Sequence, residues 1–319
     1  MARVGGIREN ERVLDVSDVN LAVLIPTYDI DGSLVPTLQS VHDAVKNYAW
    51  KSVSVVISAS CTKDSVIDEA RNWAKELKYH LVVDRVEARR IKKVALNSAF
   101  SISEVVVADF VLLFDDDLRL DSSCIISLVT ALIQDSEAVV AIGVTRADPS
   151  LVRGRRRAGA WDLDVNAAIA SRLPRTFLRS EGAITAMRGS FVKTFRFPVG
   201  TGSIVEDQAL TDFIFERGLR TQNVFEAIVF KVPPLGFNEF AIQSRRNREA
   251  LKNATTPRVT LPIRVRSAIG PTVKNPLGAF WYLVYVAGIV LGVGKPETKV
   301  GEFSPRSKST YRAASPPGT

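Results

Sequence analysis

The sequence predicts an α/β fold in which helices flank a parallel sheet, and two observations lead to this prediction. First, short runs of branched apolar residues recur along residues 1–150, and segments with a helical pattern separate them. Strands that alternate with helices are typical of right-handed βαβ units around a parallel sheet. Second, 46% of the 319 residues are hydrophobic and 24% are charged, an ordinary globular composition that allows a sizeable core.

The predicted elements of this first part are short. The first strand, Leu21–Ile25, stops at Pro26, because proline has no amide hydrogen to donate within a sheet. The second helix has acids early and lysines late, which suits the helix dipole. The predicted strands are 21–25, 52–58, 81–83, 105–114 and 138–143, and the predicted helices are 34–47, 63–78, 93–100 and 122–134.

Beyond about residue 150 the alternation weakens. Arg153–Arg157 reads as a basic loop, and residues 206–218 read as a helix that ends at Gly218. The tail is rich in serine, proline, threonine and basic residues, which predicts disorder. The later predicted elements are strands at 183–187 and 224–232, a helix at 239–252 and a disordered tail at 296–319.

The net charge of +8 makes nucleic acid, an anionic membrane surface and phosphorylated substrates possible partners. The basic residues gather in 245–274, beside an apolar segment, and do not alternate with aromatics as a nucleic-acid groove would require. We therefore expect no nucleic-acid partner. Two cysteines, Cys61 and Cys124, give no disulfide framework, and residues 1–20 lack the apolar core of a signal peptide, so an intracellular setting is expected.

Residues 276–294 carry no charge at all. As a helix, at about 1.5 Å per residue, they would cover most of a hydrocarbon core of about 30 Å. We expect this segment to span or enter a membrane; the alternatives are a buried core helix and a re-entrant hairpin. Because basic residues are denser before it than after it, the preceding domain is expected on the cytoplasmic side of the cell membrane.

Three acids, Asp115, Asp116 and Asp117, follow the apolar run 105–114. Carboxylates at the exit of a buried strand are costly unless water, hydrogen bonds or a cation stabilise them. The carboxyl ends of parallel strands are where open α/β sheets bind ligands, and such oxygens suit Mg²⁺ or Mn²⁺ completed by substrate phosphates. The alternative is a solvated acidic turn. Because strand side chains alternate, Asp116 is expected to tolerate change best.

Seven segments in order resemble family 2 glycosyltransferases with the GT-A fold, across about residues 20–250. The closest motifs are those of the cellulose, chitin and hyaluronan synthase branch. The resemblance implies a Rossmann-like, mixed but mainly parallel sheet. The segments are Ile25–Tyr28, Ser58–Asp64, Lys92–Asn97, Asp115–Asp117, Gly182–Arg188 (a loop near the acceptor), Val205–Gln208 and Gln243–Asn247.

The resemblance implies that a sugar moves from a nucleoside diphosphate sugar to a hydroxyl of a glycan or lipid-linked acceptor near the membrane, with inversion and with Mg²⁺ or Mn²⁺. Such an enzyme would be a hexosyltransferase-like transferase. The implied roles are Asp207 as general base; Pro26, Tyr28, Lys92 and Asp115 in donor binding; Asp115 and Asp117 as metal ligands; and Glu206, Gln243 and Arg246 toward the acceptor or diphosphate.

Two departures from the family pattern matter. Ala59 stands where the family usually has an aspartate that contacts the nucleobase, so Asp84 or Asp64 would have to compensate. Asn247 replaces an aromatic that helps to hold the acceptor sugar in the synthases, which weakens the expectation of processive polymer synthesis.

Three other functions stay open at this point. A nucleotidyltransferase shares the α/β sheet and the metal chemistry, and a catalytically silent relative or a basic binding protein would share the charge. The resemblance divides the chain into an N-terminal extension at 1–20, a GT-A domain at 21–252, a basic linker at 253–274, an apolar segment at 275–295 and a disordered tail at 296–319.

Overall fold

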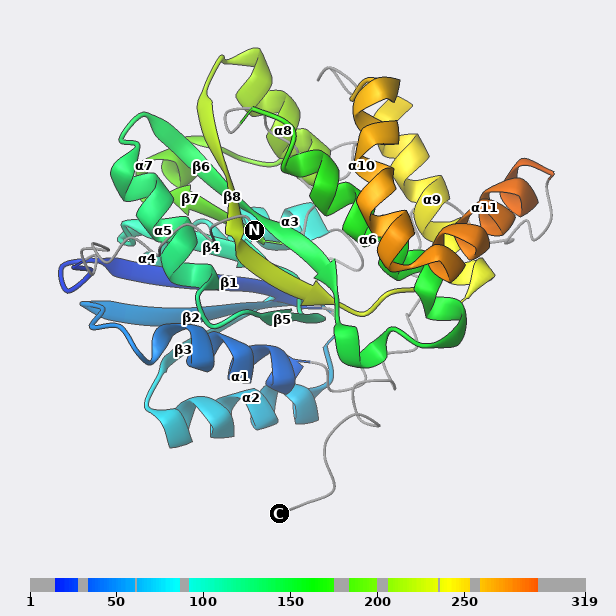
Figure 1. Cartoon of the computed structure of the whole chain (residues 1–319). Coiled ribbons are helices and arrows are strands. Elements are labelled where there is room, and N and C mark those ends of the chain that lie inside the picture. The colour runs from blue at the N-terminus through cyan, green and yellow to red at the C-terminus, as the bar shows by residue number, and fades with distance from the viewer. Residues whose placement is uncertain are drawn as a thin grey trace, which may run out of the picture.

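The protein is built around one eight-stranded sheet with the strand order β3-β2-β1-β4-β7-β6-β8-β5 (Figure 1). The computed structural model describes residues 15–27, 34–60, 62–86, 92–174, 184–199, 206–234, 236–252 and 259–291. The strands are β1 Asn20–Thr27, β2 Ser52–Ala59, β3 His80–Arg85, β4 Phe110–Phe114, β5 Leu118–Leu120, β6 Ala138–Ala147, β7 Ile184–Arg188 and β8 Arg220–Lys231.

The sheet is mixed but mainly parallel, as the sequence predicts. Strands β1 to β4 are parallel to one another, β7 runs antiparallel to both β4 and β6, and β8 is parallel to β6. The short strand β5 pairs antiparallel with β8 at the edge. The carboxyl ends of β1, β2, β4 and β8 therefore meet at one edge of the sheet, where an α/β protein places its ligand site.

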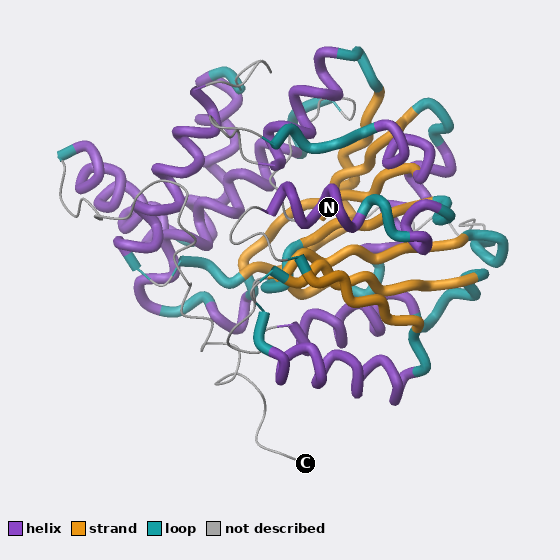
Figure 2. Tube along the Cα trace, turned by 180° about the vertical axis from the view of Figure 1, so that it is seen from behind, coloured by secondary structure: helices purple, strands orange, loops and turns teal. Residues whose placement is uncertain are grey.

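Helices cover both faces of the sheet, and Figure 2 shows them on either side of the strands. Apolar side chains of α1, α2 and α5 form one core cluster with the sheet, and those of α3, α7 and α8 form another on the opposite face. The bounds of these helices and of short α4 are α1 Leu34–Val45, α2 Asp64–Leu77, α3 Lys92–Ala99, α4 Ser103–Val106, α5 Cys124–Gln134, α7 Gly189–Thr194 and α8 Glu206–Glu216.

Four further helices form a lobe beside β6 and β8 (Figure 1). Helix α6 packs on β6 and also contacts α10 and α11, and α9 contacts α11. The rings of Trp161 on α6 and Tyr282 on α11 have centroids 4.5 Å apart, so apolar contacts join the lobe. Its helices are α6 Arg157–Ala170, α9 Phe237–Lys252, α10 Leu261–Lys274 and α11 Pro276–Val290.

Three predictions about elements are wrong. The strand predicted at 105–114 begins only at Phe110, because α4 occupies the preceding segment and Val107 is exposed. The basic loop Arg153–Arg157 is a 3₁₀ turn that leads into α6. The linker predicted at 253–274 is helical from Leu261 onward. Most of the other predicted elements agree with the structure to within a few residues at their ends.

The apolar segment forms α11, whose Ala279 and Tyr285 are buried against the lobe while much of its outer face is exposed. In the part of the chain that the structure describes, no helix combines the length and the apolar character needed to span a bilayer. The predicted disordered tail at 296–319 and most of the N-terminal extension lie outside the described residues.

Candidate active site

The candidate site lies at the sheet edge where β1, β4 and β8 end, at Thr27, Phe114 and Lys231. Two helices begin at the same place, α3 at Lys92 and α8 at Glu206, and apolar side chains of both helices pack in one core cluster. Buried strands and packed helices fix the backbone, so the polar groups that follow them are held in defined positions.

Lys92 is the centre of the charged cluster. Its Nζ lies 2.5 Å from Asp115 Oδ1 and 2.6 Å from Glu206 Oε1, and only 18% of its side chain is exposed. Burial favours the neutral amine, but the carboxylates of Asp115, Glu206 and Asp207 outweigh it and raise the pKa of Lys92 well above its usual value. The Lys92 ammonium is therefore fixed between the end of β4 and the start of α8.

The adjacent acids Glu206 and Asp207 have pKa values displaced in opposite directions. Burial, together with the charges of Glu206 and Asp115, raises the pKa of Asp207 to about 7, although Lys92 and Lys231 oppose the shift. Burial also disfavours the charged form of Glu206, but its contact with Lys92 prevails and lowers its pKa. Such a split assigns different chemical roles to two neighbouring carboxyls. Asp207 has the pKa of a general base that works near neutral pH.

The three acids after β4 divide into two groups. Asp116 is only 8% exposed and accepts a 2.6 Å hydrogen bond from Thr27 Oγ1, while Thr37 Oγ1 lies 2.8 Å from the Asp116 carbonyl oxygen. Asp115 and Asp117 are partly exposed on either side of it. Asp116 thus fastens the loop to β1 and α1, and these contacts favour a structural role over the expected tolerance to change.

The donor set suits a cation that arrives with a phosphate ligand. Among the described residues, no three His, Cys, Asp or Glu side chains converge closely enough to hold a metal ion by themselves. Asp115 and Asp117 nevertheless offer hard carboxylate oxygens at the sheet edge. Mg²⁺ is commonly bound by one or two carboxylates plus substrate phosphates and water, so two carboxylates are a sufficient protein contribution.

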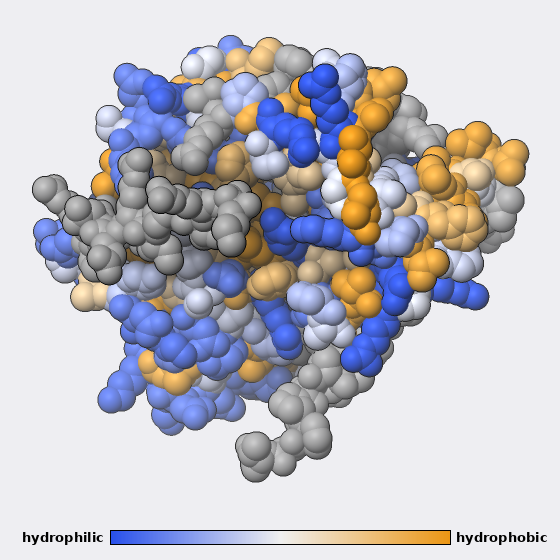
Figure 3. All heavy atoms as spheres, viewed as in Figure 1, coloured by the Kyte–Doolittle hydropathy of each residue, from blue (hydrophilic) through white to orange (hydrophobic). Residues whose placement is uncertain are grey.

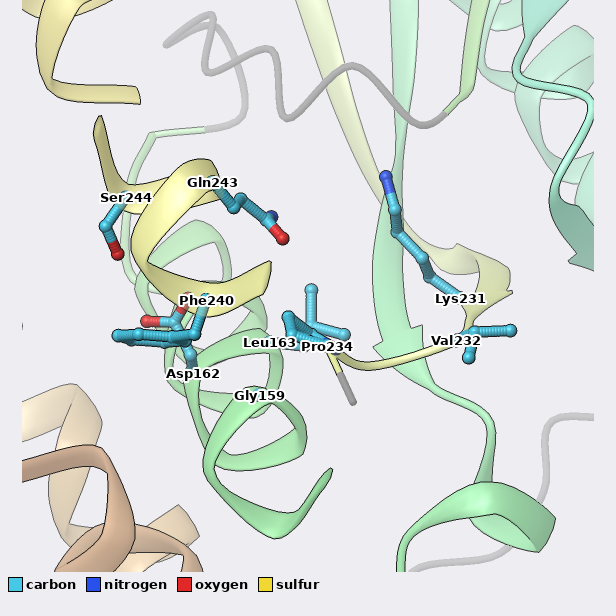
Figure 4. A pocket seen from close by; sticks show the side chains of 9 residues that line it. All are labelled: Gly159, Asp162, Leu163, Lys231, Val232, Pro234, Phe240, Gln243 and Ser244. Carbon is cyan, nitrogen blue, oxygen red and sulfur yellow. The ribbon is translucent and has the colours of Figure 1, made fainter. Parts of the chain in front are cut away.

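A small open pocket lies between α6, α9 and the end of β8. Figure 4 shows the Gln243 amide pointing from α9 toward this space, with the Lys231 side chain rising on the other side. The positive charge of Lys231 also lowers the pKa of Asp207, so Lys231 lies near both the pocket and the charged cluster. The predicted Gln243 therefore lines a pocket beside the cluster; the side chain of Arg246 lies outside the described residues.

Lys231 is the residue that the sequence reasoning missed. It ends β8 and is followed by Val232 and two prolines, so a charged side chain at a strand exit was the available signal. The same signal identified the acids after β4.

The segments expected near the nucleobase are partly described. Pro26 lies in β1 opposite Ser58 of β2, at the sheet edge that holds the candidate site, while Tyr28 lies outside the described residues. Asp64 is exposed and pairs with Arg85 at 2.5 Å. Asp84, near the end of β3, keeps its buried Oδ2 without a hydrogen-bond partner among the described residues. Of the two acids that might compensate for Ala59, Asp84 is thus the one with an unused acceptor.

Where it is described, the segment Gly182–Arg188 forms the central strand β7. Ile184 pairs with Phe114 at the edge that holds the candidate site, and Arg188 pairs with Phe110 at the opposite end of the sheet. There its guanidinium donates to the carbonyl oxygens of Asp135 and Ala138 at 3.0 and 2.7 Å. Arg188 thus has a structural role, while residues 182 and 183 lie outside the described residues and the expected place near the acceptor stays a prediction.

Comparison with known families matches residues 19–250 to the family described as Glycosyltransferase like family 2. The chain belongs to glycosyltransferase family 2. Membership decides against the nucleotidyltransferase, because the match includes the whole sheet and the charged cluster at its edge. The match concerns the family as a whole, so placement in the synthase branch stays a prediction.

Solved structures agree with this assignment at the level of the fold. The glycosyltransferase is similar to the mannosyltransferase PcManGT from Pyrobaculum calidifontis, in complex with GDP-Man and Mn²⁺, with a TM-score of 0.56, 16% identity and coverage of 96% of this chain and 82% of that one. It is also similar to residues 1–349 of TarS from S. aureus, with a TM-score of 0.50, 14% identity and coverage of 86% and 92%. No curated protein sequence matches the chain.

Proposed function

We propose that this glycosyltransferase transfers a hexose with inversion from a nucleoside diphosphate sugar to a hydroxyl group, using Asp207 as the general base. The observation that carries the proposal is the charged cluster. A half-buried carboxyl with a pKa of about 7 stands beside a fixed ammonium, at the carboxyl edge of the sheet. This combination supplies a proton acceptor and a positive charge at one place.

The proposed step uses one base. Asp207 takes the proton of the acceptor hydroxyl, the hydroxyl oxygen forms a bond to the anomeric carbon, and the bond from that carbon to the diphosphate oxygen breaks. Attack opposite the leaving group inverts the anomeric carbon. Glu206 is engaged by Lys92, so it suits a role in holding the charge balance around Asp207 and not a role as a nucleophile.

Asp115 and Asp117 would hold Mg²⁺ or Mn²⁺ together with the donor diphosphate. The cation, when bound, neutralises negative charge on the leaving diphosphate as a Lewis acid. Lys92 keeps its proton and holds Asp115 in place. The complex of PcManGT with GDP-Man and Mn²⁺ supports the choice of cation and of a nucleotide sugar as donor.

For the donor base, we assign Pro26 at the end of β1 and Tyr28 beyond it to the surroundings of the base, and Asp84 to a hydrogen bond with a ring N–H. The unused acceptor of Asp84 supports this assignment. For the acceptor and the product diphosphate, we assign Gln243 and Arg246, with Lys231 in addition. The pocket beside Asp207 supports the role of Gln243 and Lys231.

The proposed acceptor is a glycan or a lipid-linked glycan close to the cytoplasmic face of the cell membrane. The apolar surface of the lobe beside the pocket supports a membrane-proximal acceptor. Single additions are proposed in place of processive synthesis, because Asn247 lacks the aromatic ring that the synthases use.

A thermal-shift screen over sugar nucleotides tests the proposal. A ligand that binds only the folded state raises the melting temperature by mass action. We expect one nucleotide sugar to stabilise the protein in the presence of Mn²⁺, and Asp117→Ala to abolish that gain. A protein that no sugar nucleotide stabilises, with or without the cation, would contradict the proposed donor chemistry.

A further inference from the structure

The lobe carries an apolar surface that no described element covers. On α10, large apolar side chains that are exposed recur at every fourth residue: Leu261, Val265, Ile269 and Val273. On α11 the exposed side chains are all apolar, and the large ones are Leu277, Phe280, Trp281, Leu283, Val284, Val290 and the following Leu291. Figure 3 shows the part over α11 as a hydrophobic patch at the right of the view. A contiguous exposed patch of this kind marks an interaction surface.

The two helices are held rigidly, so the surface is preformed. Asn275 lies at the corner between them, where its side chain accepts a hydrogen bond from Gly278 N at 3.0 Å and donates one to the Arg157 carbonyl oxygen at 3.2 Å. Val273 before this corner and Leu277 after it are both exposed. The opposite face of α11 packs on the lobe, so the helix cannot be surrounded by lipid and can only lie along a surface.

We infer that α10 and α11 dock this enzyme onto the surface of an anionic bilayer, with α11 lying in the plane of the interface. Neither helix contains an acidic residue, and the exposed Arg264 and Arg266 project to the two sides of the apolar stripe beside Val265. An apolar face bordered by basic residues is the signature of an interfacial helix, because the apolar side chains enter the acyl boundary and the arginines meet anionic headgroups.

The basic rim of this surface, formed by Arg264 and Arg266, favours a lipid bilayer over two other possible occupants. A symmetric dimer through this face would bring its basic rim onto itself, which is repulsive. The chain's own residues 292–319 carry five basic and two acidic residues, so they would also meet like charge. An anionic headgroup layer is the occupant whose charge is complementary.

Docking has a consequence for the proposed function, and this part of the inference rests on that function. Phe240 lines the pocket beside Lys231 and Gln243, and its ring centroid lies 5.5 Å from that of Tyr285 on α11. The pocket is therefore close to the docked helix, and an acceptor anchored in the bilayer would reach it with a short polar head.

Vesicle flotation of the full chain, without donor, tests the inference. We expect binding to vesicles of phosphatidylcholine and phosphatidylglycerol at roughly 3:1, and weaker binding to phosphatidylcholine alone. The double variant Ile269→Asp with Leu283→Asp should lower the partition by about tenfold or more, because it places two carboxylates in the apolar face. Val107→Asp is the matched control: Val107 is 69% exposed against 60% for Ile269, but lies on another face.

Arg264→Gln with Arg266→Gln should lower binding to the anionic vesicles by roughly 30-fold and leave binding to phosphatidylcholine unchanged. The Asp207→Asn variant should bind like the wild type, so loss of turnover and loss of docking are separate results. Equal vesicle binding by the Asp double variant and the wild type would overturn the inference. So would light scattering that shows a wild-type dimer, made monomeric by the same double variant, with no vesicle binding.

Discussion

The charge balance of the candidate site depends on one lysine placed between three carboxylates. Lys92 contacts Asp115 and Glu206 directly and lowers the pKa of Asp207 through space. Glu206 raises the pKa of Asp207, whereas Lys92 lowers it. Mutation of each neighbour should therefore shift this pKa in a different direction.

The acidic limb of the pH profile of kcat/KM reports the pKa of the base in the free enzyme. We expect wild-type kcat/KM to rise with pH through about 7, the value to which burial and the nearby acids raise the pKa of Asp207. Glu206→Gln removes an acid that raises this pKa, so the limb should move to lower pH. Lys92→Met removes a cation that lowers it, so the limb should move to higher pH. Shifts of both variants in the same direction would contradict the assigned base.

Asp116→Ala should destabilise the protein by about 1–3 kcal/mol, because it leaves the buried hydroxyl of Thr27 without its carboxylate acceptor. Urea unfolding measures the effect. Asp117→Ala is the comparison variant, since Asp117 is partly exposed, and its cost should be smaller. If Asp117→Ala lowers the unfolding midpoint more than Asp116→Ala does, the structural role assigned to Asp116 is wrong.

At the residue scale, the order of motifs along the chain placed Lys92, Asp115, Glu206 and Asp207 in one site, and the structure brings their side chains together. Sequence could not distinguish the buried Asp116 from its neighbours by alternation, because the chain after β4 turns and no longer follows a strand. Lys231 was missed because a single lysine at a strand end is common.

At the scale of elements, close backbone approach constrains the start of α7. A Cβ at position 189 would lie 1.9 Å from the Ala108 carbonyl oxygen, so only glycine fits where α7 passes the chain before β4. At position 270, on the exposed side of α10, a Cβ would meet no atom of the described residues within 4 Å apart from its own helix backbone and its chain neighbours, one of which is Pro271.

Gly189→Ala should therefore cost about 3 kcal/mol, since backbone has to move to admit the methyl group. The same change at Gly270 should alter stability by less than about 1 kcal/mol, because the entropy advantage of alanine in a helix is offset by the contact of its Cβ with the ring of the following Pro271. Thermal or urea unfolding of both variants checks the pair. A Gly189→Ala protein as stable as the wild type would show that the approach to Ala108 is looser than described.

Helix α6 shows why part of the fold could not be predicted. Its buried residues alternate over Leu163, Val165, Ala167 and Ile169, a period that suits a strand better than a helix. The cause is tertiary: α6 contacts β6 on one side and α10 and α11 on others, so it buries more than one stripe. Amphipathic periodicity identifies helices with one buried face, and α6 is not one of them.

At the scale of the whole molecule, the alternation of strands and helices was enough to predict an α/β fold with a mainly parallel sheet. The antiparallel pairing of β7 with β4 and β6 is a long-range contact that no local pattern encodes. The lobe of α6, α9, α10 and α11 depends equally on contacts between distant segments. Its basic and apolar residues were visible in the sequence, but their arrangement on a helical pair was not.

The central claim is that the cluster at the sheet edge transfers sugar with Asp207 as the base. The most direct test is sugar-nucleotide turnover with Mn²⁺ by the wild type and by Asp207→Asn, with Glu216→Gln, an exposed acid on the same helix, as the control. We predict that Asp207→Asn lowers kcat by about 10²–10⁴-fold while Glu216→Gln leaves it unchanged. Wild-type turnover that persists undiminished in Asp207→Asn would contradict the claim.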